Sequence, residues 1–168
     1  MKKSYLIFIT FILLSSCNSI VKTIYDDTTA RYNAYFIANE EIKNIEEDYE
    51  KNLNQGFDSL IDLTYKIDTN QVSSIQERTQ NSIEKLSILI QRQTTSKYVY
   101  PSYALIGKSR LLNLNLKEAI TTLKYVNSKS NNNEANIMAL VYLLRAYTEN
   151  KDYNSAQEVD KFLTNREM

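Results

Sequence analysis

Two stretches in the second half of the sequence share one spacing of large and small residues, and this repeat constrains the fold more than any other feature. Each stretch places large residues three positions apart, then a small residue sixteen positions after the first of them. Such a repeat is typical of helical hairpins that stack side by side, because one hairpin alone cannot bury its apolar face. The matching positions are Tyr103, Ile106, Gly107, Arg110, Ala119 and Leu123 in the first copy and Leu140, Leu143, Leu144, Tyr147, Ala156 and Asp160 in the second.

The two copies are 37 residues apart, slightly more than the roughly 34 residues of a tetratricopeptide repeat, whose spacing both otherwise follow. The asparagine loop 131–133 can hold the additional residues. We expect Gly107 and Ala119 to be small because the helices of the hairpin approach closely there, while the large residues fill the groove against the neighbouring hairpin. Leu144 replaces the glycine in the second copy and Asp160 replaces an apolar residue, so this copy is expected to pack less tightly.

The composition favours an all-α fold. Two glycines and one proline are too few for turn-rich β architectures. Apolar residues three and four apart predict one long amphipathic helix over about 29–54 and another over 74–93, with a shorter helix near 57–67 between them. Pro101 suits the first turn of the next helix, where no backbone N–H is needed. We therefore predict antiparallel helical hairpins of tetratricopeptide type, stacked as a short solenoid.

The first sixteen residues predict a signal peptide that ends at a lipid-attachment site. Lys2 and Lys3 precede an apolar run over 5–14, which is too short for a permanent membrane-spanning helix of about 20 residues. Leu14, two serines and Cys17 then resemble the bacterial lipobox, in which a diacylglycerol is attached to the cysteine sulfur and the chain is cut before it. This resemblance makes Cys17 the lipid-attachment residue; a buried core cysteine is the less favoured alternative.

These features divide the chain into four parts. We expect a signal peptide over 1–16, a lipidated tether over 17–27, an amino-terminal helical region over 28–95 and two tetratricopeptide-like repeats over 96–168. No polar capping helix follows the second repeat, although solenoids need one to cover the terminal core face. Either this end docks on another molecule or the chain is the amino-terminal part of a longer protein; we favour the second and expect the last repeat to be incomplete.

The residue inventory excludes several chemistries. The chain has no histidine and one cysteine, so a Cys/His metal site, a Ser-His-Asp triad and an intramolecular disulfide are impossible. The formal net charge is zero, which provides no basic surface for nucleic acid. We expect no enzymatic activity, no cofactor and no small-molecule substrate. An acidic row on the first long helix is expected to be a solvated face rather than a set of catalytic carboxylates; it consists of Glu40, Glu41, Glu46, Glu47 and Asp48.

Aromatic residues cluster near the start of the first long helix. Tyr32 and Phe36 share one stripe of the helix, while Tyr35 lies beside it, so the helix presents aromatic rings on two faces. Most aromatic residues at helical spacing belong to a core. One of these faces is nevertheless a candidate partner surface, because tyrosine is enriched at binding hot spots.

Three stretches together resemble a known family. The segments 28–42, 96–126 and 139–157 are similar, in the same order, to the amino-terminal region of the SprE/PorW-type tetratricopeptide lipoproteins of the type IX secretion and gliding-motility machinery of Bacteroidota. The helix over 28–36, with Thr-Ala-Arg-Tyr-Asn followed by Tyr-Phe, is the most specific part. The resemblance implies a non-enzymatic lipoprotein, anchored in the outer membrane and facing the periplasm, with protein partners in a secretion or motility complex. Members of the family carry many more repeats than this chain.

Two other functions stay open. Another outer-membrane scaffold built from similar hairpins, either a β-barrel assembly lipoprotein or a glycan-binding lipoprotein, would use the same kind of helices. A periplasmic hydrolase is disfavoured, because the inventory leaves only a Ser-Lys or paired-carboxylate mechanism and neither has a recognisable motif here.

Overall fold

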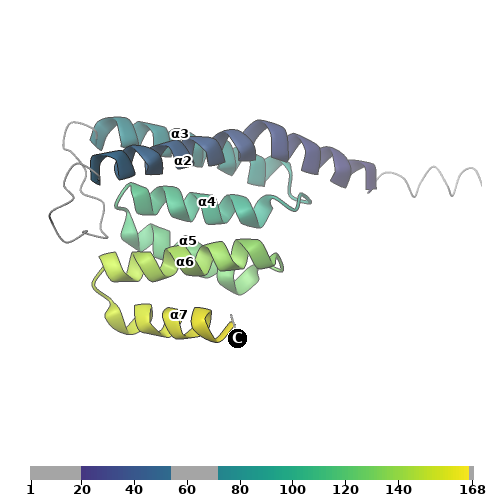
Figure 1. Cartoon of the computed structure of the whole chain (residues 1–168). Coiled ribbons are helices and arrows are strands. Elements are labelled where there is room, and N and C mark those ends of the chain that lie inside the picture. Colours follow the sequence, from purple (N-terminus) through teal and green to yellow (C-terminus); the bar gives the residue numbers. More distant parts are fainter. Residues whose placement is uncertain (1–19, 54–71, 167–168) are drawn as a thin grey trace, which may run out of the picture.

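The computed structural model describes residues 20–53 and 72–166, and within these ranges the chain is all-helical, as the sequence predicts. Each helix packs against the next one along the chain (Figure 1). A helical segment over 20–29 leads into a π-helix, η1 (Ala30–Tyr35), and then into α2 (Phe36–Leu53). The other elements are α3 (Val72–Arg92), α4 (Val99–Leu112), α5 (Leu116–Lys129), α6 (Asn133–Glu149) and α7 (Tyr153–Arg166).

The first long helix begins earlier than predicted. The segment 20–29 is helical, although most of it was expected to be a tether, and the cause is a tertiary contact that local periodicity does not reveal. The Thr95 hydroxyl, in the turn between α3 and α4, donates to Asp26 at 2.7 Å, and the Ser96 hydroxyl donates to Asp27 at 2.9 Å. These bonds fix the segment against the turn. The short helix predicted near 57–67 lies outside the described residues.

The first hairpin, α2 and α3, shares a core with α4. Ile42 and Ile45 on α2 and Leu86 on α3 are fully buried, and they belong to one apolar cluster with Leu105 on α4. The Tyr49 hydroxyl donates to the backbone oxygen of Leu112 at 3.1 Å, which satisfies a carbonyl in the last turn of α4. The α2–α3 hairpin therefore lies against the two repeats as part of the same stack.

The backbone of the last two hairpins repeats at the interval found in the sequence. Leu114 and Lys151, which are 37 residues apart, both adopt left-handed backbone conformations, with φ of 57° and 60°. The backbone hydrogen bonds that end α4 and begin α5 recur, shifted by 37 residues, at the end of α6 and the start of α7. The helices α5 and α7 begin and end at equivalent positions. The sequence repeat is thus also a repeat of the fold.

The first helices of successive hairpins also touch. Besides its contacts with α3 and α5, α4 packs against α2 and α6. Small residues on α6 permit this approach, because Ala135 and Ala139 are fully buried in the cluster that holds Ala104 and Leu123. Val141 on α6 is 48% exposed, so this helix also carries an apolar side chain that faces solvent.

Candidate functional site

A groove runs along the side of the stack between α3 and α5, with α4 as its floor. Two adjoining pockets form it, with volumes of about 530 Å³ and 640 Å³. Ile90, Tyr103 and Tyr125 line both pockets, so the two are continuous. Volumes of about 300–1,000 Å³ are typical of ligand sites. The groove is therefore large enough to hold a ligand or a partner segment.

Three tyrosine side chains line this groove, those of Tyr100, Tyr103 and Tyr125. The Tyr125 ring on α5 lies edge-on to the Tyr103 ring, with 5.0 Å between the centroids, and 6.5 Å from the Tyr100 ring. Burial, followed by the neighbouring tyrosines, raises the pKa of Tyr103 above its usual value. Sequence reasoning did not single out Tyr125. A usable signal was present, because Tyr103 and Tyr125 are equally far from the hairpin turn at Leu114 and so lie opposite each other.

Arg110, one of the repeat positions, makes polar contacts with α5. Its guanidinium lines the groove and donates through Nη1 to the Thr122 hydroxyl on α5. Its Nε lies 3.4 Å from the Glu118 carboxylate. The arginine thus joins α4 to α5 through a hydrogen bond and an ion pair at the wall of the groove.

A polar cluster joins the first helices of all three hairpins. Lys108 on α4 is buried, and its Nζ lies 2.6 Å from Oε2 of Glu46 on α2. Tyr142 on α6 places its ring 4.9 Å from the same Nζ and its hydroxyl 3.5 Å from Glu46. Burial lowers the pKa of Lys108, but hydrogen bonds with Glu46 and Tyr142 and the negative charge of Glu46 raise it more, so its pKa lies above the ordinary value. Lys108 is therefore a charged structural link and not a neutral amine available for catalysis.

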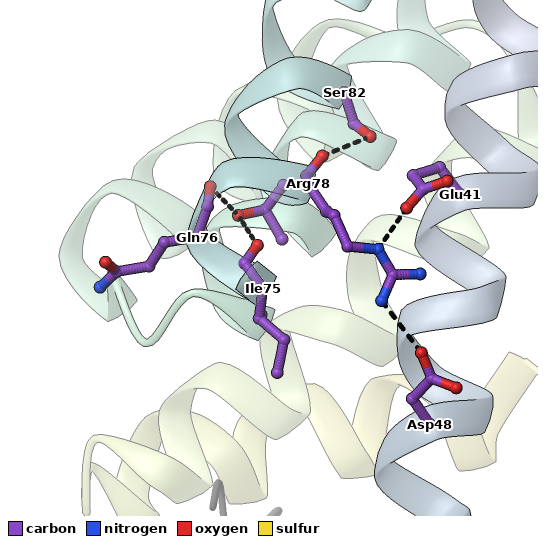
Figure 2. Close-up of polar contacts among 7 residues, drawn as sticks. Glu41, Asp48, Ile75, Gln76, Arg78 and Ser82 are labelled. Atoms are coloured by element: carbon purple, nitrogen blue, oxygen red, sulfur yellow. Dashed lines mark hydrogen bonds and ion pairs between the residues drawn. The ribbon is translucent and has the colours of Figure 1, made fainter. Parts of the chain in front are cut away.

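The acidic row on α2 is not the purely solvated face that the sequence suggested. Arg78 on α3 donates through Nε to Glu41 and through Nη1 to Asp48, the second bond being 2.9 Å long (Figure 2). Glu46 pairs with Lys108, as described above. Three of the five carboxylates thus bind cations on neighbouring helices. They contribute to the packing of α2 and do not form a carboxylate pair around an open site.

The structure separates the three aromatic residues predicted as a partner surface. The Tyr35 ring contacts the Tyr98 ring in a tilted arrangement, with the centroids 4.9 Å apart, and packs against the core. Its burial, followed by the charges of Glu134 and Tyr98, raises the pKa of Tyr35 to about 12. Phe36 is 56% exposed. The side chain of Tyr32 lies outside the described residues. Tyr35 therefore packs against the interior, whereas the Phe36 side chain faces solvent.

The residues predicted to pack the two repeats all lie in the interior of the stack or at its edge. A Cβ on Gly107 would lie 2.5 Å from Leu123 Cδ2, which is the close approach that the small residue was expected to permit. Ala119 is fully buried beside Leu111 and Ala146. The buried members are Ile106, Gly107, Ala119, Leu123, Leu140, Leu143 and Ala156, and the partly buried members are Tyr103 and Tyr147.

The predicted lipid-attachment residue Cys17 lies outside the described residues. Among residues 20–53 and 72–166, no three acidic, cysteine or histidine side chains gather in a way that could hold a metal ion. None of the helices in these ranges is long and apolar enough to cross a membrane. In comparisons with protein-family models, curated protein sequences and solved structures, the chain matches none of them.

Proposed function

We propose that this chain is a non-enzymatic lipoprotein, anchored in the outer membrane through acylated Cys17 and facing the periplasm, that acts as a tetratricopeptide-type adaptor in type IX protein secretion or gliding motility. Its partners in this role are the membrane and the proteins of a secretion or motility complex. The proposal joins a lipobox to a stack of helical hairpins in one short chain.

The observation that carries the proposal is the doubled hairpin. The turns at Leu114 and Lys151 have the same left-handed backbone, 37 residues apart, and the close contact of Gly107 with Leu123 lies at the position where tetratricopeptide hairpins carry small residues. Stacked hairpins present extended surfaces for other proteins. An adaptor needs such a surface and no catalytic group, and this agrees with the absence of histidine from the chain.

Two features would let the stack act as a rigid bridge. Lys108, Glu46 and Tyr142 tie α2, α4 and α6 together, so a load applied to one hairpin passes to the others. The groove with Tyr103 and Tyr125 offers aromatic rings of the kind that dominate protein interfaces. We expect partner contacts along this groove and at Phe36.

The test is affinity purification of the acylated protein from chemically cross-linked membranes. We expect type IX secretion or motility components to be recovered with the wild-type protein. Cys17→Ala should be a folded protein that leaves the membrane fraction and recovers fewer of them. Persistent membrane association of Cys17→Ala, or recovery of β-barrel assembly components alone, would contradict the proposal.

A specific observation also favours the glycan-binding alternative. Tyr100, Tyr103 and Tyr125 gather in a groove that also carries hydroxyl and amide side chains, a combination that suits sugar rings. Calorimetric titration with outer-membrane and dietary oligosaccharides tests it. A measurable affinity that disappears in Tyr125→Ala would support a glycan-binding lipoprotein, and no affinity for any oligosaccharide would exclude it.

A further inference from the structure

The helical segment 20–29 carries an exposed apolar face. Figure 1 shows this segment projecting beyond the stack of hairpins. Four large apolar side chains within six residues, Ile20, Val21, Ile24 and Tyr25, are between 59% and 68% exposed. Residues three and four apart lie on the same side of a helix, so Ile20 with Ile24 and Val21 with Tyr25 form two adjacent rows, which together we call the amino-terminal apolar face. Scattered exposed apolar residues are ordinary, but such a group indicates contact with a partner or a membrane.

The end of the same segment is fixed to the body of the protein. Asp26 is buried and accepts a hydrogen bond from Thr95, and Asp27 accepts hydrogen bonds from the Ser96 hydroxyl and from the backbone N–H of Lys97 at 2.8 Å. A segment held in this way cannot turn its apolar face toward the core. The amino-terminal apolar face therefore points away from the hairpins and needs an external occupant.

We propose that the amino-terminal apolar face rests in the interfacial layer of the membrane leaflet that holds the acyl chains of Cys17. The inference rests on the proposed lipid anchor. Three peptide steps separate Cys17 from Ile20, and an extended chain spans at most about 3.6 Å per residue, so the backbone of Ile20 lies within about 11 Å of Cys17. Amphipathic helices bury their apolar faces about 5–10 Å into the boundary between headgroups and acyl chains.

The side chains suit an interface. Tyrosine is enriched where membranes meet water, because its ring is apolar and its hydroxyl is polar. Lys22 lies between the apolar residues in sequence, and its long stem can carry the ammonium group to the lipid phosphates. The consequence is an oriented molecule: a docked helix, joined to the α3–α4 turn by two aspartates, holds the hairpins at a fixed angle to the membrane.

The chain contains no tryptophan, so a single substitution introduces a unique fluorophore. Tyr25→Trp reports on the apolar face. Tyr153→Trp is the matched control, because Tyr153 is 65% exposed and begins α7, the last helix of the stack (Figure 1). Both full-length proteins are produced in a host that acylates lipoproteins and are reconstituted into phosphatidylethanolamine and phosphatidylglycerol vesicles. Mass spectrometry of the amino-terminal peptide records acylation of Cys17 independently.

With Cys17 acylated, we expect the emission of Tyr25→Trp to shift to the blue and to lose most of its intensity with bromine-labelled lipids, whereas Tyr153→Trp keeps its emission. An unquenched, solvent-like Tyr25→Trp on acylated protein overturns the inference and leaves the lipid anchor intact. If Tyr25→Trp is quenched although Cys17 is not acylated, the result supports the membrane contact and overturns the lipid anchor. If Tyr25→Trp is not quenched and Cys17 carries no acyl chain, both the membrane contact and the lipid anchor are overturned.

Discussion

Leu123 on α5 fills the space beside the backbone of Gly107 on α4, where an added Cβ would lie 2.5 Å from Cδ2 and 2.6 Å from Cγ. Leu123 is fully buried, so it has little freedom to move away. Overpacking costs about 1–3 kcal/mol, and alanine offsets about 1 kcal/mol of this by its better helix propensity. We expect Gly107→Ala to lower the free energy of unfolding by up to about 2 kcal/mol in urea titrations.

A double-mutant cycle separates this contact from other effects of the substitution. Leu123→Ala alone should cost about 2–5 kcal/mol, because it leaves a cavity. In the double variant the methyl group that Gly107→Ala introduces occupies part of that cavity, so the combined loss should be smaller than the sum of the single losses. If the double variant lost as much unfolding free energy as the two single variants together, Gly107 and Leu123 would not be in tight contact.

The ion pair of Lys108 with Glu46 gives a second prediction. Lys108→Met leaves the Glu46 carboxylate without its cation; because that side chain is 20% exposed, we expect a loss of about 2–3 kcal/mol, below the range for fully buried pairs. Replacing both partners, as Lys108→Met with Glu46→Leu, should restore most of the stability. Chemical denaturation measures both quantities, and a double variant as unstable as Lys108→Met would refute the pairing.

The raised pKa of Tyr35 predicts that the folded protein loses stability at high pH. Its folded-state pKa is about 12, whereas the unfolded chain releases this proton near pH 10. Between these values the folded state binds more protons than the unfolded state, so stability falls as the pH rises from 10 to 12, and the group contributes no pH dependence below pH 10. Tyr35→Phe should make the decline less steep in thermal melts over this range. Tyr153→Phe, which removes the hydroxyl of an exposed ring, is the control.

The left-handed turn residue Leu114 predicts a gain of stability. A φ of 57° is unfavourable for leucine, by roughly 1–2 kcal/mol relative to glycine, and the exposed side chain loses little buried area when removed. We expect Leu114→Gly to raise the free energy of unfolding by about 1 kcal/mol. Lys151→Gly, at the equivalent turn, should give a similar gain. A loss of stability in both variants would mean that these turns are not strained.

Sequence reasoning succeeded where a residue's role depends on its own helix and hairpin. The spacing of Gly107 and Ala119 identified the repeat, and the interval of 37 residues recurs in the backbone at Leu114 and Lys151. Pro101 lies in the first turn of α4, as its missing N–H predicted. These features depend on residues that are close together in the chain, so a single sequence is enough to reveal them.

The features that sequence reasoning missed depend on contacts between distant segments. Asp26 and Asp27 lie in the stretch expected to be a tether, but they bind a turn almost seventy residues away, and this contact extends the helix to residue 20. Arg78 joins two carboxylates on α2, which turns an expected solvated row into part of an interface. Tyr125 contributes to a groove only once α5 folds back on α4. Helical periodicity shows which face is polar but not which neighbour it meets.

The proposed role in type IX secretion is tested by quantitative proteomics of culture medium and outer membranes from a clean deletion strain and its complemented control. We predict that type IX cargo disappears from the medium while the outer-membrane β-barrel proteins stay at normal levels, and that the wild-type gene restores export but Cys17→Ala does so poorly. Normal cargo export and normal gliding in the deletion strain would contradict the claim, and a general depletion of β-barrel proteins would favour the barrel-assembly alternative.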